Sequence, residues 1–158
     1  MFRELLRKNK QLAQEDCIHI LQNEKRGVLS LLGDNDYPYG FPMNHFYNEE
    51  DGCIYFHCGK QGHKLDAISK SNKASFCVYT QGESVANTWA LTIKSVIVFG
   101  KIVKIAHQDE IRTITRKLSY KFTQDENYIQ KEIDTYALDT LLLKLVPENI
   151  CGKCIVEN

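Results

Sequence analysis

Apolar and polar residues along the chain follow different periods, and each change of period marks an element. The first 26 residues predict an N-terminal helical extension, because apolar positions recur at near-helical spacing among Gln, Glu, Lys and Asn. These apolar positions are Leu12, Cys17, Ile20 and Leu21. Gly27 ends the helical pattern, and the residues after it follow the shorter period of an extended chain.

Two extended runs follow, GVLSLL and YPYGFPMNHFY, with the turn-rich sequence GDND between them. Pro38 and Pro42 in the second run argue against a helix and indicate an edge strand or a bulged strand. Asp51-Gly52 is a two-residue turn signal before the next apolar run, CIYFHC. The second run and CIYFHC are therefore expected to form a hairpin.

Two short helices are expected in the rest of the chain. The first spans about two turns between Gly62 and Asn72, because apolar residues lie three positions apart between these two boundary residues. The second runs from His107 to Ser119, where apolar residues again recur at helical spacing. Its first turn is acidic, which suits the positive end of a helix dipole.

Three further strands are expected at residues 76–79, 88–105 and 140–150. The run 88–105 is long and β-branched and contains Gly100, so we interpret it as one bent strand or two consecutive strands. Residues 147–158 are expected to form a C-terminal tail that closes the last strand.

The count is about six strands in hairpin connections with two or three short helices, and no alternation of strand and helix. This pattern excludes a doubly wound sheet and favours a mainly β, α+β fold, a small antiparallel barrel with helices packed on it. Residues 1–158 are expected to form a single domain. The chain has no G-x-G-x-x-G or G-x-x-x-x-G-K sequence, so the usual dinucleotide and P-loop sites are not expected.

Charge and composition narrow the functional classes. The 20 basic residues balance the 20 acidic ones, so binding to nucleic acid or to an anionic membrane surface is not expected. No stretch approaches the length of about 20 apolar residues that a membrane span requires. The N-terminus lacks the apolar core of a signal peptide, and we therefore expect a cytoplasmic protein whose six cysteines are free thiols.

The densest group of chemically active residues is FHCGKQGHK, where a strand is expected to end and a helix to begin. Two glycines would let backbone N–H groups approach a ligand, and a helix N-terminus favours an anion. Lys60, His63 and Lys64 add cationic donors, so a phosphate monoester is a natural guest. The alternative interpretation is a solvated basic loop, and His57 could equally be a histidine on the barrel wall.

Two other features point to chemistry. Cys151 and Cys154 form a C-x-x-C, which could be a reactive dithiol but lacks a second pair and a strand-to-helix context, so incidental thiols are the simpler interpretation. No cluster of Cys and His repeats a zinc spacing, and no metal site is expected. The aromatic residues between Tyr37 and Phe56 serve core packing or hold a flat ring. A flat ring with one phosphate describes FMN or pyridoxal phosphate, of which FMN is preferred.

The sequences RGVLSLLGDNDYPYGFPMNHFY, GCIYFHCGKQGHKLDAISKSNKASFCV and KSVIVFGKIVKI resemble the pyridoxamine phosphate oxidase-like family of FMN-binding split barrels. Within this family the match is to the branch that includes Nim-type nitroimidazole resistance proteins, and it covers nearly the whole chain. The resemblance implies a six-stranded antiparallel split β-barrel with short helices. It also implies a homodimer whose two FMN sites lie in the subunit interface.

The resemblance also assigns residues to the cofactor. The flavin ring would lie against the strand that ends with Phe56, His57 and Cys58. The basic pair before the helix, here His63-Lys64 where the family commonly has Arg-Lys, would hold the phosphate.

Three more assignments follow from the resemblance. Asn44 would lie near the flavin ring. Ser95 takes the place of a glutamine that contacts the flavin in the oxidases. A histidine at the position of His57 lies close to the flavin in Nim-like proteins and is associated with activity, so His57 is the first candidate for a catalytic side chain.

Three functional hypotheses remain. The first is a flavin oxidoreductase that takes electrons from NAD(P)H or a reduced protein and reduces a small electrophile such as a nitroaromatic or a quinone, with His57 supplying a proton. The second is a non-enzymatic protein that binds flavin or haem for storage or sensing. The third is a C-x-x-C redox or metal protein without flavin.

Overall fold

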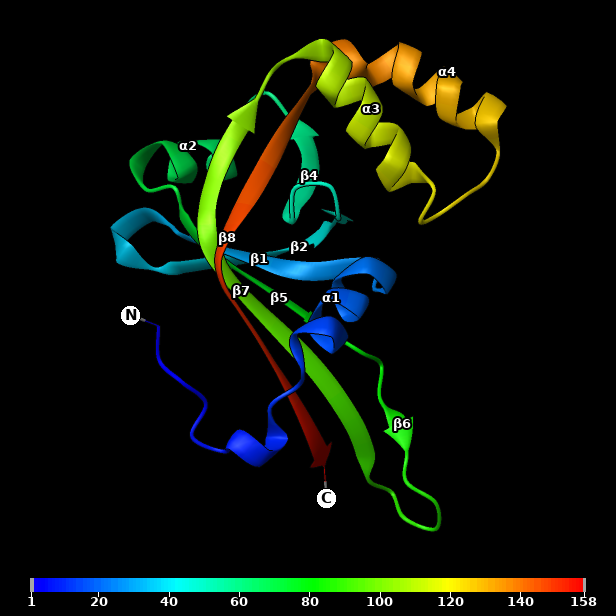
Figure 1. The fold of residues 1–158 in the computed structure, drawn as a ribbon. Helices are drawn as coiled ribbons and strands as arrows, with labels where there is room; N and C mark the ends of the chain where they lie inside the picture. The colour runs from blue at the N-terminus through cyan, green and yellow to red at the C-terminus, as the bar shows by residue number, and fades with distance from the viewer. Residues whose placement is uncertain (1, 158) are drawn as a thin grey trace.

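The β-branched run that contains Gly100 forms one continuous strand, β7 (Leu91–Ile105), in the computed structural model, which describes residues 2–157. β7 pairs along its length with β8 (Thr140–Glu157), and the two form a long ribbon through the molecule (Figure 1). The pairing shifts between Phe99 and Gly100, where Asn149 and Pro147 are the partners on β8. Such a bulge bends a strand, so the predicted bent strand is confirmed.

All strand pairs in the sheet are antiparallel, and the strand order is β2-β1-β5-β7-β8-β4-β3, with β6 paired to β7 outside this order. The structure has eight strands within residues 2–157, so the expected count of six is wrong. The second extended run divides into β2 and β3. Strand β6 is too short to show a periodic pattern of apolar and polar residues in the sequence. The remaining strands are β1 (Arg26–Leu32), β2 (Pro38–Asn44), β3 (Phe46–Asn48), β4 (Cys53–Gly59), β5 (Lys73–Tyr79) and β6 (Glu83–Ser84).

A single residue, His45, separates the two strands at opposite ends of the sheet order, β2 and β3. The sheet is therefore strongly curled, because both of its outermost strands come from one stretch of chain that bends at His45. The His45 ring is fully buried, and its Nε2 lies 2.8 Å from the carbonyl oxygen of Leu21. Its ring also packs edge-on against Phe76, with 4.9 Å between the ring centroids.

Burial lowers the pKa of His45 to about 3, and the nearby positive charge of Lys121 contributes to this shift. Between pH 6.5 and 3 the unfolded chain binds a proton that the folded protein excludes, so stability falls as the pH falls through this window. We expect His45 to contribute a slope of about 1.4 kcal/mol per pH unit to the free energy of unfolding.

Urea unfolding of the wild type, His45→Gln and the exposed control His107→Gln at pH 7, 6 and 5 measures this slope. The free energy of unfolding of the wild type and of His107→Gln should fall more steeply with acid than that of His45→Gln. Equal slopes for all three proteins would contradict the assignment.

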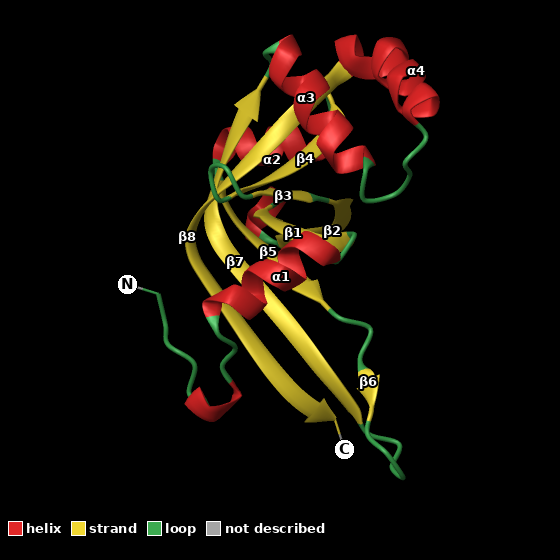
Figure 2. Ribbon diagram, turned by 45° about the vertical axis from the view of Figure 1, so that its right-hand side comes forward, coloured by secondary structure: helices red, strands yellow, loops and turns green. Residues whose placement is uncertain are grey.

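Four α-helices pack against the sheet within residues 2–157 (Figure 2). Helices α3 and α4 lie side by side over one end of the ribbon, and α1 lies across the curled sheet. No helix in the described part of the chain is long and apolar enough to cross a bilayer. The helices are α1 (Gln14–Asn23), α2 (His63–Lys70), α3 (Gln108–Ser119) and α4 (Glu126–Tyr136), with 3-10 turns at Lys8–Lys10, Asp34–Asp36 and Ala137–Asp139.

The expected hairpin between β3 and β4 and the expected helices α2 and α3 are confirmed. Three details differ from the sequence analysis. The N-terminal helix is limited to α1, and the rest of residues 2–26 is a 3-10 turn and extended chain. Residues 147–157 are no tail, because they continue β8 and pair with the first half of β7. Helix α4 was not expected, although Asp125 caps it by accepting a hydrogen bond from the backbone N–H of Tyr128 at 3.0 Å.

Two separate groups of buried apolar side chains hold these layers together. The larger group fills the interior of the curled sheet and includes the fully buried residues Leu29, Phe56, Phe76, Val98 and Leu143. The smaller group joins the outer face of β4 and β8 to helices α3 and α4, and its members are Cys53, Tyr55, Ile111, Ile114, Ile129, Ile133, Ala137 and Leu142. The outer face of β4 is therefore covered by helices, which is the setting of the site described below.

Gly100 is required at the bulge by close packing. A Cβ atom at this position would overlap the backbone carbonyl oxygen of Val146 on β8. We expect Gly100→Ala to destabilise the protein by about 2 kcal/mol, because the two long strands would have to separate. Chemical denaturation measures the effect, and Gly59→Ala is the matched control, since a Cβ there meets no atom within 4 Å. A Gly100→Ala protein as stable as Gly59→Ala would contradict the packing argument.

Candidate functional site

Most of the candidate residues lie at the end of strand β4 and the beginning of helix α2. Successive side chains of a strand point to opposite faces. Phe56 and Cys58 are buried in the interior of the curled sheet, where the Phe56 ring packs edge-on against Phe76. His57 lies on the outer face and is exposed. On the His57 side of β4, Phe56 and Cys58 can therefore offer a ligand only their backbone atoms.

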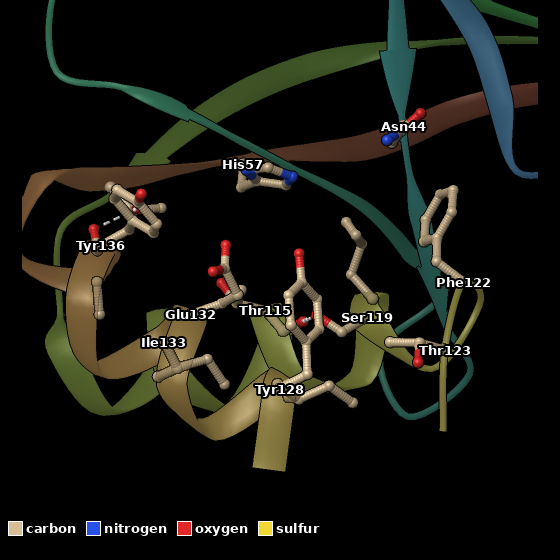
Figure 3. A pocket seen from close by; sticks show the side chains of 14 residues that line it. Asn44, His57, Thr115, Ser119, Phe122, Thr123, Tyr128, Glu132, Ile133 and Tyr136 are labelled. Atoms are coloured by element: carbon tan, nitrogen blue, oxygen red, sulfur yellow. Dashed lines mark hydrogen bonds between the residues drawn. The ribbon is translucent and has the colours of Figure 1, made fainter. Parts of the chain in front are cut away.

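A cavity of about 360 Å³ lies between this outer face and helices α3 and α4 (Figure 3). His57 lies on the sheet side of the cavity, and Tyr128 and Glu132 point toward it from α4. The volume is within the range of small-molecule sites. The lining residues are Asn44, His57, Thr115, Leu118, Ser119, Phe122, Thr123, Tyr128, Ile129, Glu132, Ile133, Tyr136, Ala137 and Thr140.

Asn44 and His57, which the sequence analysis places near a ring, line this same cavity from two different strands. Asn44 is the last residue of β2, and its Oδ1 accepts a hydrogen bond from Nε of Arg26 at 2.8 Å. This bond leaves the Asn44 amide NH₂ as a donor for a ligand. The bend of the chain at His45 is what brings the end of β2 to the cavity.

The electrostatic surroundings of His57 disfavour its protonated form. Although the His57 side chain is exposed, the protein atoms around the cavity desolvate it and lower its pKa, and the positive charge of Lys64 lowers the pKa further. The imidazole is therefore neutral at neutral pH. A neutral ring donates one hydrogen bond and accepts another, or binds a metal, and supplies a proton as an acid only at lower pH.

The N-terminus of α2 is open. Gly62, which precedes the helix, has a φ of +124°, a conformation that side-chain-bearing residues rarely adopt. No side chain in the described part of the chain caps the helix, and the first N–H groups of a helix have no partner within it. A Cβ atom at Gly59 or Gly62 would meet no atom within 4 Å, so there is space beside these N–H groups for an anion.

The three cations near this helix N-terminus are not equivalent. Lys64 Nζ lies 5.3 Å from the centroid of the Phe41 ring, and within residues 2–157 no carboxylate lies within ion-pair distance of it. His63 stacks on Tyr39 with 4.2 Å between the ring centroids, and its Nε2 lies 3.3 Å from the carboxylate of Asp34. Lys60 is exposed in the preceding loop. Lys64 is therefore the cation best placed for an anion.

Ser95 is not brought to this group within one chain. It lies on β7 between Tyr79 of β5 and Lys153 of β8. The part of β8 that pairs with β4 ends at Leu145, which is eight residues from Lys153, or roughly 25 Å along an extended strand. Ser95 belongs to the half of the ribbon that extends away from α2 and α4 (Figure 1).

The C-x-x-C sequence does not form a dithiol. Cys151 and Cys154 lie on β8, where they pair with Ile97 and Lys94. Residues three apart on a strand point to opposite faces and are about 10 Å apart, which is too far for a disulfide. Both are free thiols, which favours the interpretation as incidental cysteines.

The wall of the cavity that α3 and α4 contribute is not predicted by the sequence pattern. Tyr128, Glu132 and Tyr136 lie four residues apart on one face of α4, and Thr115 faces them from α3. The Asp125 cap and the buried pair Ile129 and Ile133 were a readable signal for the helix. Which of its polar residues face β4 is set by tertiary packing.

The residues present fit a phosphate monoester attached to a flat ring. An open helix N-terminus and Lys64 suit the phosphate, and the charge of Lys64 acts on His57, which borders the cavity. The cavity has aromatic walls and a few polar groups, as is usual for sites that bind flat ligands. FMN is one ligand that presents this combination.

Comparison with known proteins identifies the family of the chain. The sequence profile of the pyridoxamine 5'-phosphate oxidase family matches residues 13–154. A search of curated proteins finds no significant match.

Three solved structures illustrate the shared fold. A candidate 5-nitroimidazole antibiotic resistance protein from Bacteroides thetaiotaomicron is 17% identical, with a TM-score of 0.76 over 92% of this chain and 87% of that one. A FAD-binding protein from Mesorhizobium loti is 18% identical, with a TM-score of 0.66 over 92% and 97% of the two chains. A FAD and haem binding protein from Mycobacterium smegmatis is 22% identical, with a TM-score of 0.71 over 91% and 72%. The matched residues span most of the sequence, and the chain belongs to the pyridoxamine 5'-phosphate oxidase family.

Proposed function

We propose that the protein is an FMN-dependent oxidoreductase that reduces a small electrophile such as a nitroaromatic or a quinone. One observation supports this most directly. Strand β4, which carries His57 to the cavity, ends shortly before α2 begins with its open N-terminus, and the charge of Lys64 reaches His57. A flavin whose phosphate binds at α2 would therefore extend its ring along the sheet side of the cavity, beside His57, and leave the α4 side to the electrophile. Family membership favours flavin chemistry at such a site.

Each residue has a separate task in this proposal. Lys64 and the N–H groups of α2 bind the phosphate, with His63 and Lys60 at its border. Asn44 donates a hydrogen bond to the ring. His57 lies at the cavity and would transfer a proton to the electrophile there. Helices α3 and α4 exclude water from the outer face of β4. Bound FMN supplies the electron transfer, with NAD(P)H or a reduced protein as the donor.

The proposal includes a homodimer with the cofactor at the subunit interface. Ser95 lies on the outer face of the ribbon, because residues directly opposite each other on paired strands share a face. The same face exposes Tyr79, Ile97, Phe99, Val103 and Val146, and the Phe99 ring stacks on Phe2. A second copy seated on this apolar face would bring its own Ser95 toward the flavin, which one chain alone cannot do.

A second candidate is a flavin- or haem-binding protein that catalyses no turnover. The neutral state of His57 favours it, because a neutral imidazole is the form that binds haem iron. One of the similar structures is described as a FAD and haem binding protein. The visible spectrum separates the two cofactors, because haem has an intense band that flavin lacks.

Anaerobic addition of NADH to the purified flavoprotein distinguishes the enzyme from the binder. We expect the flavin absorbance to decrease with NADH and to return when a nitroaromatic or a quinone is added. If NADH is not the donor, NADPH and a reduced ferredoxin or flavodoxin are tested in the same way. A flavin that stays oxidised with all of these donors would refute the oxidoreductase and support the binder.

A further inference from the structure

The cavity above His57 has an unusual distribution of charge. Of its lining residues, Glu132 is the only acid, none is a lysine or an arginine, and the one titratable base is His57, which is neutral at neutral pH. Arg26 donates a hydrogen bond to Asn44 but lines a different surface cavity. A ligand in this cavity therefore meets one negative charge and no positive charge on the lining.

Glu132 is available to a ligand because the arginines of α3 that face α4 already form ion pairs with other carboxylates of α4. Arg112 on α3 pairs with Asp134 of α4 at 2.8 Å, and Arg116 pairs with Glu126 at 2.8 Å. Within residues 2–157 no side chain donates a hydrogen bond to Glu132 or forms an ion pair with it, and its carboxylate points toward the cavity (Figure 3).

The other lining groups suit an aromatic ligand with polar atoms. Tyr128 and Tyr136 flank Glu132 by one helical turn on either side, and Phe122 lines the same cavity, so a carboxylate is framed by rings. Aromatic faces attract a cation as well as another ring. The Thr115 hydroxyl is buried at the cavity and has no hydrogen-bond partner among residues 2–157, so a polar ligand atom or a water would satisfy it.

We propose that this cavity selects a small aromatic compound that carries a protonated amine or another cationic nitrogen, which Glu132 binds. A phosphorylated or carboxylated substrate is disfavoured, because its negative charge would face the Glu132 carboxylate with no compensating cation on the lining of the cavity. The inference rests on the proposed function in one respect, namely that the ligand of the cavity is the electron acceptor. It narrows the acceptor from any small electrophile to a cationic aromatic one.

Three probes with the same ring and nitro group but different charge test the proposal: 4-nitrobenzylamine, 4-nitrobenzyl alcohol and 4-nitrobenzoate. Ligand-detected NMR titrations of the flavin-loaded protein give their dissociation constants. We expect the amine to bind about tenfold more tightly than the benzoate, with the alcohol between them, which corresponds to about 1.4 kcal/mol for one partly buried charge pair. The rate of nitro reduction with each probe should follow the same order.

Variants of Glu132 keep the test specific. In Glu132→Gln the three affinities should converge to within about twofold, and in Glu132→Lys the benzoate should become the preferred probe. Glu83→Gln is the matched control, because Glu83 is exposed on β6 and does not line the cavity. Equal binding of the three probes to the wild type, or a preference for the amine that survives in Glu132→Gln, would overturn the proposal.

The outcomes separate this inference from the proposed function. A protein that binds and turns over flavin but does not discriminate among the probes would refute the selectivity and leave the oxidoreductase intact. A protein that discriminates among the probes in binding but has no flavin-dependent turnover would refute the oxidoreductase and leave the charge selectivity of the cavity intact.

Discussion

Replacing Lys64 with alanine should lower the affinity for FMN about thirtyfold. In the proposed complex Lys64 provides a charge-assisted contact to the phosphate, and such contacts contribute about 2 kcal/mol. The ammonium group has no carboxylate partner in the described part of the chain, so little of its interaction with the phosphate is lost to competition. Titration of the apoprotein with FMN, followed by quenching of flavin fluorescence, gives the dissociation constants.

Lys70→Ala is the control for this experiment. Lys70 lies at the other end of the same helix and pairs with Asp34, so its removal changes the net charge equally without removing a phosphate ligand. Its FMN affinity should stay within about threefold of the wild type. If both variants bind FMN as the wild type does, the phosphate does not lie at the N-terminus of α2.

Replacing His57 with alanine should lower turnover about a hundredfold and leave FMN bound, because His57 borders the cavity and not the phosphate position. Burial and the charge of Lys64 lower the pKa of His57, so its acidic form is populated only below the usual range of histidine. Wild-type turnover per bound flavin should therefore rise as the pH decreases below about 6.5, and that of His57→Ala should not. Initial rates with one acceptor across this pH range measure both effects.

His107→Ala is the matched histidine control, because His107 is exposed at the start of α3 and does not line the cavity. Its turnover and pH profile should equal those of the wild type. Unchanged turnover in His57→Ala would remove His57 from the mechanism. Loss of the flavin in this variant would instead assign His57 to binding.

The elements that can be predicted well from the sequence are those determined by residues that lie close together in the chain. The β3–β4 hairpin follows from the turn at Asp51-Gly52, and the helix after Gly62 follows from local spacing and a boundary glycine. The juxtaposition of His57 with an open helix N-terminus was also predictable. These residues are close in sequence, and the strand ends only a few positions before the helix begins.

The elements that sequence did not predict depend on contacts between distant segments. Residues 147–158 are predicted from the sequence as a tail after the last strand, but pairing with β7 carries β8 across the bulge. The burial of His45 arises from α1 and the sheet interior together. The orientation of Glu132 into the cavity depends on how α3 and α4 pack on β4, which no local pattern encodes.

The most direct test of the central claim is the visible absorption spectrum of the freshly purified protein, recorded with its size by sedimentation and with the cofactor released by heat. The account predicts a yellow protein with a flavin band, a dimer, and one FMN released per chain. A colourless protein that takes up no added FMN would contradict it. Release of FAD instead of FMN would contradict the assignment of the cofactor.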